Sequence, residues 1–169
     1  MCDSFDINKY LGTWYQLATY PSWFNHAVGY NTTAHYSWEC GENTNHIKVC
    51  NSTIIRGNKY DSVGTARQVG LASFKVEFPM SEKERLAANR EFNYEESIEV
   101  QVDYPNYVID RYWTDTCGEY KFAVVTDPTR QSFYLLSRCP HPSLAQYNQV
   151  MDYSIRMFDQ SRIVQTPHF

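Results

Sequence analysis

The sequence lacks the features that mark several large classes of protein. Its 169 residues contain 15 Lys and Arg against 19 Asp and Glu, so the net charge of -4 provides no basic face for nucleic acid or an acidic membrane surface. No stretch approaches the roughly 20 apolar residues that span a bilayer. The five His are scattered and no Cys-x-x-Cys or His-x-x-x-His pattern occurs. We therefore predict no nucleic-acid partner, no membrane insertion and no metal site; no pattern specifies an oligomeric state.

Aromatic residues, by contrast, are abundant: they make up 16% of the chain, including 14 Tyr. They fall in short runs of β-forming residues that are separated by turn residues. Eight strands are predicted, over Gly12–Tyr20, Gly29–Glu39, His46–Ile55, Lys59–Val69, Ser73–Phe78, Tyr107–Thr114, Tyr120–Thr126 and Ser132–Arg138. Successive hairpins of this kind favour an all-β fold, an eight-stranded antiparallel up-and-down β-barrel whose closure removes exposed edges.

Two further elements follow the strands. Apolar residues spaced three and four apart predict one C-terminal α-helix over Ser143–Phe158, with Ser143 as its N-cap and its apolar stripe packed on the outside of the barrel. The segment Ser161–Gln165 is expected to add a short edge strand. The length fits one domain over residues 1–169.

One segment, residues 79–106, is far longer than a hairpin loop of roughly 2–5 residues. A capping-box spacing predicts a short helix over Glu82–Arg90, and alternation near Val100 predicts a further strand. The segment joins two strands at the mouth of the barrel, so we expect it to act as a lid, with Phe92 or Tyr94 covering the interior. The alternative is an ordered surface excursion without a role in binding.

Three landmarks in the sequence resemble the signatures of the lipocalin family. The first is Gly12-Thr13-Trp14, in which a glycine and a large indole enter the first strand. The second is Thr114-Asp115, with Tyr120 following, although one extra residue intervenes; the third is Arg138, whose guanidinium is expected to lie over Trp14. Within the family the surrounding sequence is most similar to apolipoprotein D and the insect bilin-binding lipocalins.

The resemblance implies a non-enzymatic protein that carries or sequesters a small hydrophobic ligand of the bilin, fatty-acid, retinoid or steroid class. No cofactor is required, and a non-covalently bound bilin chromophore is compatible with the resemblance. Alternation along the strands, with Trp14 taken as inward, predicts the ligand-binding face. Its residues are Ala34, Tyr36, Trp38, Ser62, Gly64, Ala66, Phe74, Val76, Phe78, Ile109, Arg111, Phe122, Val124, Tyr134 and Leu136.

Arg111 admits two interpretations. Simple alternation places its guanidinium inside the barrel, where it would need a ligand carboxylate, an acid or water, because an unpaired buried charge is costly. The alternative is a local bulge that turns the side chain outward. The small residues Ser62, Gly64 and Ala66 are expected to leave volume for a ligand.

The cysteines predict two disulfides: Cys40 with Cys50 across a hairpin, and Cys117 with Cys139 at the closed end. With the glycosylation sequons at Asn31 and Asn51, both expected on the outer face, they favour a secreted protein over a cytoplasmic one.

Two alternative functions remain at this point. One is an enzyme of the prostaglandin-isomerase type, which needs a nucleophilic thiol inside the barrel. The other is a protein that binds a biogenic amine, through an inward carboxylate, or a protein partner.

Overall fold

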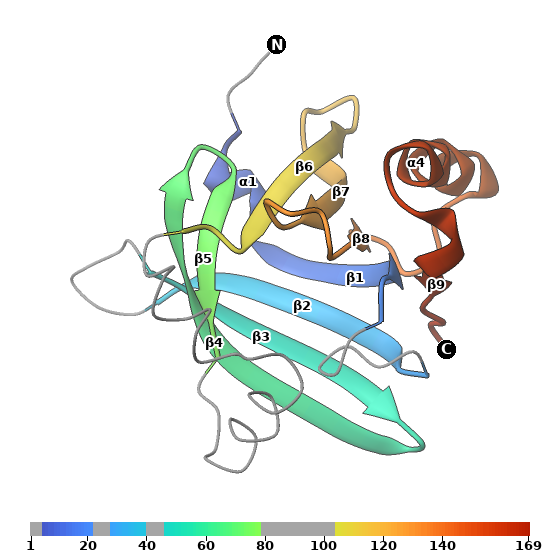
Figure 1. Ribbon diagram of the computed structural model, residues 1–169, viewed down its shortest axis with the longest axis horizontal. Coiled ribbons are helices and arrows are strands. Elements are labelled where there is room, and N and C mark those ends of the chain that lie inside the picture. The colour runs from blue at the N-terminus through green and yellow to red at the C-terminus, as the bar shows by residue number, and fades with distance from the viewer. Residues whose placement is uncertain (1–4, 22–27, 40–45, 79–103) are drawn as a thin grey trace.

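The computed structural model describes residues 5–21, 28–39, 46–78 and 104–169. Eight antiparallel strands form a closed barrel, in which each strand pairs with the next and β1 pairs with both β8 and β2 (Figure 1). The strands are β1 (Gly12–Thr19), β2 (Tyr30–Trp38), β3 (His46–Ile55), β4 (Asn58–Gly70), β5 (Ser73–Glu77), β6 (Tyr107–Thr114), β7 (Tyr120–Thr126) and β8 (Tyr134–Ser137). The predicted barrel is confirmed, and β3, β6 and β7 have the predicted bounds.

The remaining elements lie around the barrel. A short helix, α1 (Ile7–Tyr10), precedes β1 and was not predicted, whereas β9 (Val164–Gln165) pairs with β1 on the outside as expected. The helix α4 (Leu144–Met157) begins after the predicted cap, because the Ser143 hydroxyl accepts a hydrogen bond from the Gln146 N–H at 3.2 Å. A 3₁₀ turn, η1 (Gln160–Arg162), links α4 to β9. Among the described residues no helix is long and apolar enough to cross a membrane.

Two groups of buried side chains hold these elements together. The interior cluster fills the closed end of the barrel and includes Trp14, Tyr36 and Phe74. The helix-facing cluster lies between α4 and the outer side of the barrel and includes Phe133, Leu135 and Val150. The second cluster confirms the prediction that the C-terminal helix packs outside the barrel.

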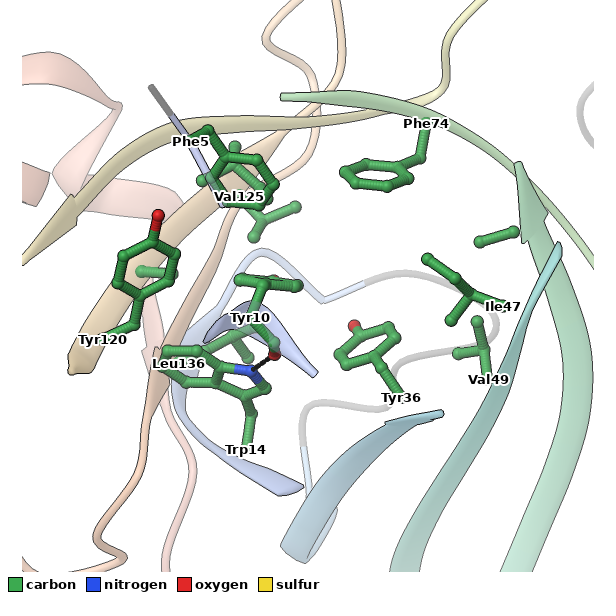
Figure 2. Packing of buried hydrophobic residues seen from close by; sticks show 13 residues of the cluster. Phe5, Tyr10, Trp14, Tyr36, Ile47, Val49, Phe74, Tyr120, Val125 and Leu136 are labelled. Atoms are coloured by element: carbon green, nitrogen blue, oxygen red, sulfur yellow. Dashed lines mark hydrogen bonds between the residues drawn. The ribbon is translucent and has the colours of Figure 1, made fainter. Parts of the chain in front are cut away.

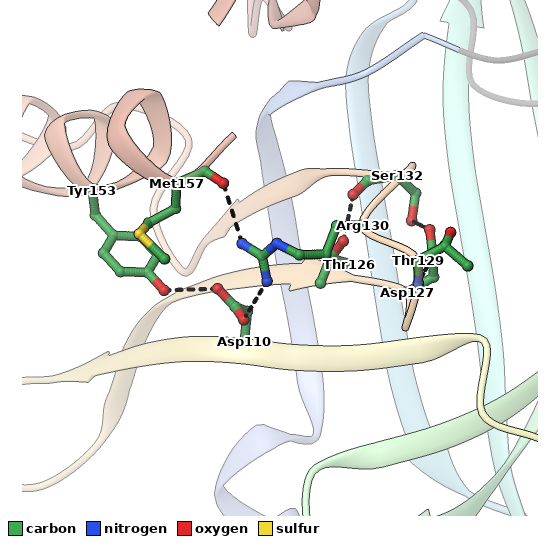
Figure 3. A network of polar contacts seen from close by, with 8 residues as sticks. All are labelled: Asp110, Thr126, Asp127, Thr129, Arg130, Ser132, Tyr153 and Met157. Carbon is green, nitrogen blue, oxygen red and sulfur yellow. Dashed lines mark hydrogen bonds and ion pairs between the residues drawn. The ribbon is translucent and has the colours of Figure 1, made fainter. Parts of the chain in front are cut away.

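Polar contacts fix α4 in place beside β6 and the turn after β7. Asp110 on β6 accepts hydrogen bonds from the Arg130 guanidinium at 2.9 Å and the Tyr153 hydroxyl at 2.7 Å (Figure 3). The same Arg130 donates to the Met157 carbonyl at 3.3 Å, at the last turn of α4. The C-terminal half of the helix is therefore anchored to the outside of the barrel.

Candidate functional site

One end of the barrel is closed by Trp14 and Arg138, as the signature residues predict. Trp14 is completely buried, and its indole N–H donates to the Tyr10 carbonyl at 2.7 Å. The Arg138 guanidinium lies 3.8 Å from the centre of the Trp14 ring. It also donates to the carbonyls of Lys9, Thr13 and Leu11, each at 2.8 Å. This stacking and hydrogen bonding together seal what we call the closed end; the opposite end is the mouth.

Gly12 is required by the approach of Arg138. Its φ of 104° is a conformation that favours glycine, and a Cβ there would lie 3.2 Å from an Arg138 guanidinium nitrogen. The second signature is also a structural turn, because the Asp115 carboxylate accepts the backbone N–H groups of Cys117 at 2.9 Å and Glu119 at 3.0 Å. Thr114 ends β6 immediately before it. All three signatures therefore build the closed end.

The interior cluster contains most of the side chains that alternation placed inside (Figure 2). Its members come from α1 and from strands on all sides of the barrel, and their rings point toward a shared centre. The predicted residues found buried in it or packed against it are Ala34, Tyr36, Ala66, Phe74, Val76, Phe78, Ile109, Tyr134 and Leu136.

Three tyrosine hydroxyls meet within this cluster. The hydroxyl of Tyr107 is hydrogen-bonded to that of Tyr10 and lies 2.8 Å from that of Tyr36. Burial raises the pKa of Tyr36 to about 12, and it raises the pKa values of Tyr10 and Tyr107 well above their usual range. Burial, with Tyr36 and Asp127 nearby, likewise raises the pKa of Tyr134. At neutral pH these four phenols are uncharged hydrogen-bond donors.

Side chains fill most of the space around these hydroxyls. The cavity beside Tyr10, Tyr36 and Tyr107 has a volume of only about 10 Å³, close to the space that one water molecule needs. The volume expected beside Gly64 is occupied, since a Cβ there would lie 2.6 Å from the Phe78 ring. The closed half of the interior is therefore a packed floor rather than an open cavity.

The inner wall toward the mouth has a different character. Asn51 on β3 pairs with Ala34 on β2 and with Ser62 on β4. These three side chains share the inner face with Val49 and Gly64, which lie two residues closer to the closed end on β3 and β4. Ser62 is exposed, and Tyr60, two residues further toward the mouth, is 55% exposed. This half of the wall is polar and is not filled by the described side chains.

The predicted orientation of three residues is wrong for one shared reason. The pairing of β6 with β7 shifts between Ile109 and Arg111, so a bulge turns Arg111 outward, as the alternative interpretation held. Its guanidinium lies 4.8 Å from the Trp113 ring and 5.1 Å from the Tyr153 ring, beside α4. Because β6 pairs with β7, the residues opposite it also face outward: Phe122 and Val124 belong to the helix-facing cluster.

Two other predicted residues lie outside the interior cluster. Trp38 is 38% exposed beside α1, where its indole N–H donates to the Asn8 side chain at 3.2 Å. Ser62 lies on the mouth half of the wall. The predicted lid residues Phe92 and Tyr94, with the helix and strand expected in the same segment, fall outside the described residues.

The disulfide predictions are wrong, because Cys50, Cys117 and Cys139 are free thiols. Cys50 pairs with His35 in the middle of β2, whereas Trp38 at the end of β2 pairs with Ile47. Cys50 therefore lies three residues farther along β3 than the pair that precedes the hairpin turn, and so away from the turn. Cys117 lies in the β6–β7 turn and Cys139 beyond β8, on opposite sides of β7. Cys40 falls outside the described residues.

The sequons also differ from expectation. Asn51 faces the barrel interior, so the prediction that both sequons lie on the outer face is wrong. At Asn31 the backbone has a φ of 54° in a bulge of β2, and its side-chain oxygen accepts the Phe169 N–H at 2.8 Å.

Sequence reasoning missed Tyr10 and Tyr107 as interior residues. Tyr107 could have been found, because it lies two residues before Ile109 on the same strand and therefore on the same face. Tyr10 carried no comparable signal, since α1 is only four residues long. In the described part of the chain no group of three His, Cys, Asp or Glu side chains could hold a metal ion.

Comparison with known proteins identifies the family. A family model described as a lipocalin-like domain matches residues 5–168. This chain belongs to the lipocalin-like family. Temperature-induced lipocalin-1 of Arabidopsis thaliana is 26% identical to it over 164 residues, which are 96% of this chain and 78% of that protein.

Solved structures share the fold at low sequence identity. Apocrustacyanin C1 has a TM-score of 0.61 and 17% identity, over 97% of this chain and 80% of its own. The cockroach allergen Per a 4 has a TM-score of 0.64 and 15% identity, over 100% of this chain and 92% of its own. These likenesses establish architecture, and the ligand has to be inferred from the residues of this barrel.

Proposed function

We propose that this lipocalin binds a small lipophilic ligand in the mouth half of its barrel and carries or sequesters it without chemical change. The observation that carries this proposal is the contrast along the barrel axis. The closed half is sealed by Trp14 and packed, whereas the inner wall around Ser62 is exposed. A ligand that enters from the mouth would have the apolar floor beneath it and the polar wall of β3 and β4 beside it.

The other two functions are less well supported. An isomerase of the prostaglandin type needs a thiol inside the barrel, but Cys50 lies beside the exposed residues His35 and Val63 on the outer face. The other two described thiols, Cys117 and Cys139, lie in turns beyond the strands. A biogenic-amine binder needs an inward carboxylate, and no described Asp or Glu is fully buried.

Titration of the native protein with methyl retinoate, oleate and biliverdin, followed by tryptophan fluorescence and native mass spectrometry, tests the proposal. We expect saturable binding of at least one compound at a ratio of one to one. Absence of binding by all three at micromolar concentration would contradict the proposal.

A pair of adjacent substitutions locates the site. Ser62→Trp places an indole on the inner wall of β4, and we expect it to weaken binding at least tenfold. Val63→Trp is the matched control, because Val63 lies next on the same strand, faces outward and is 52% exposed. Equal affinities of the two variants would place the ligand outside the barrel.

A further inference from the structure

The interior phenols have more donor protons than the described residues accept. The hydroxyls of Tyr10, Tyr36 and Tyr107 are hydrogen-bonded to one another, so these three phenols find their partners within the trio. Tyr134 adds a fourth phenol on the inner face of β8, and its hydroxyl has no hydrogen-bond partner among the described residues. A buried donor without an acceptor is unfavourable, and the adjoining cavity of about 10 Å³ provides space for a small acceptor atom.

In the described part of the chain, the same region lacks a free positive charge. No described Lys, Arg or His is fully buried, and Arg111, the cation expected inside, faces α4. Arg138 is the cation next to Tyr10, but its guanidinium already donates to four backbone carbonyls beneath the floor. A carboxylate at the phenols would therefore lose its hydration and find only neutral donors, which is a costly way to bury a charge.

Access from the mouth leads toward these hydroxyls. Tyr134 begins β8 and Tyr107 begins β6, and both strands run from the mouth toward the closed end. Tyr10 lies on α1 beneath them. The leading end of a ligand would thus meet Tyr134 and Tyr107 before the sealed floor. An acceptor atom at that end would accept a hydrogen bond from the unused phenol donor.

We propose that the interior phenols select a neutral lipophile that carries a hydrogen-bond acceptor, such as an ester or ketone carbonyl, at its buried end. This inference rests on the proposed ligand-binding function and specifies the ligand class of that site. It predicts a higher affinity for a neutral ester than for the free fatty acid or retinoic acid with the same hydrocarbon skeleton.

Methyl retinoate and retinoate form a suitable pair of probes, because they share a skeleton and differ in the charge of the head group. At pH 7.4 we expect the ester to bind at least tenfold more tightly than the acid. Tyr107→Phe should reduce the affinity for the ester about two- to tenfold, as expected for a lost neutral hydrogen bond. The ratio of the two affinities should fall, whereas a general loss of structure would weaken both ligands equally.

Tyr153→Phe is the matched control. It removes a phenol hydroxyl that is hydrogen-bonded to Asp110 on the outside of the barrel, and the affinity ratio should stay unchanged. Melting temperatures verify that both variants are folded, and Tyr134→Phe supplies a second interior variant if Tyr107→Phe is unfolded. Methyl palmitate and palmitate repeat the comparison with another skeleton.

The outcomes separate this inference from the proposed function. If an acid binds as tightly as its ester, or if neither interior variant changes the ratio, the inference is wrong while ligand binding stands. If no ester or acid of either pair binds, both fail.

Discussion

The interior cluster and the helix-facing cluster use alternate residues of the same strands but differ in chemistry. On β7, Phe122 and Val124 face the helix, whereas the smaller Ala123 faces the interior with Val125. The helix-facing cluster is closely packed, and Phe133 and Leu135 are completely buried. The interior cluster also contains large apolar side chains, but it gathers six tyrosines around a small cavity. The helix-facing cluster thus supports the wall from outside, whereas the interior cluster adds phenol hydroxyls that can contact a ligand.

The largest expected effect is at the closed end. Trp14→Ala removes the indole that contacts Tyr10 and supports Arg138, and it should lower the free energy of unfolding by about 3–5 kcal/mol. Denaturant unfolding measures this loss. A change below about 1 kcal/mol would show that the seal contributes little.

The helix-facing cluster should affect stability without affecting binding. Phe133 is completely buried against Tyr20 and Phe158, so Phe133→Ala should cost about 3 kcal/mol. Affinity for methyl retinoate, measured well below the melting temperature, should change less than about twofold because no interior side chain is altered. A large loss of affinity in a folded variant would break the distinction between the two clusters.

Alkaline pH should weaken the packing of the interior cluster. The pKa of Tyr36 is raised to about 12, so the folded state retains a proton that the unfolded chain loses near pH 10. This contribution, on the order of 2 kcal/mol, is fully present below pH 10 and is lost as the pH rises toward 12. Tyr36→Phe should flatten the dependence of unfolding free energy on pH in that range. An unchanged slope would contradict the assignment.

The smallest effect is expected at Arg111. Its contacts with Trp113 and Tyr153 are on the outside, so Arg111→Ala should cost about 0.5–1 kcal/mol. Affinities for retinoate and its methyl ester should both remain the same. Selective loss of retinoate binding would instead indicate that Arg111 reaches the ligand.

The architecture was predictable because local signals agree. Turn residues bound β3, β6 and β7, and the cap at Ser143 fixes the start of α4. The face on which each side chain lies is harder to predict, since one extra residue in a strand reverses the orientation of every side chain after it. The bulge beside Asp110 is invisible to simple alternation, and it moves Arg111 together with Phe122 and Val124 from the inside to the outside.

The candidate site was predictable where the strands are regular. Tyr36, Phe74 and Leu136 lie on uninterrupted alternation and were placed correctly in the interior. Alternation does not predict how far side chains fill the interior. Phe78 occupies the space above Gly64 because of the path that the chain takes after β5. Convergence of Tyr10 with Tyr107 depends on barrel closure, which brings together residues 97 positions apart.

A crystal structure of the complex with methyl retinoate tests the central claim most directly. We predict density for one ligand along the inner wall between Asn51 and Ser62, with its carbonyl oxygen within hydrogen-bonding distance of the Tyr107 or Tyr134 hydroxyl. Density confined to the outer surface, or an ester carbonyl directed away from these phenols into solvent, would contradict it.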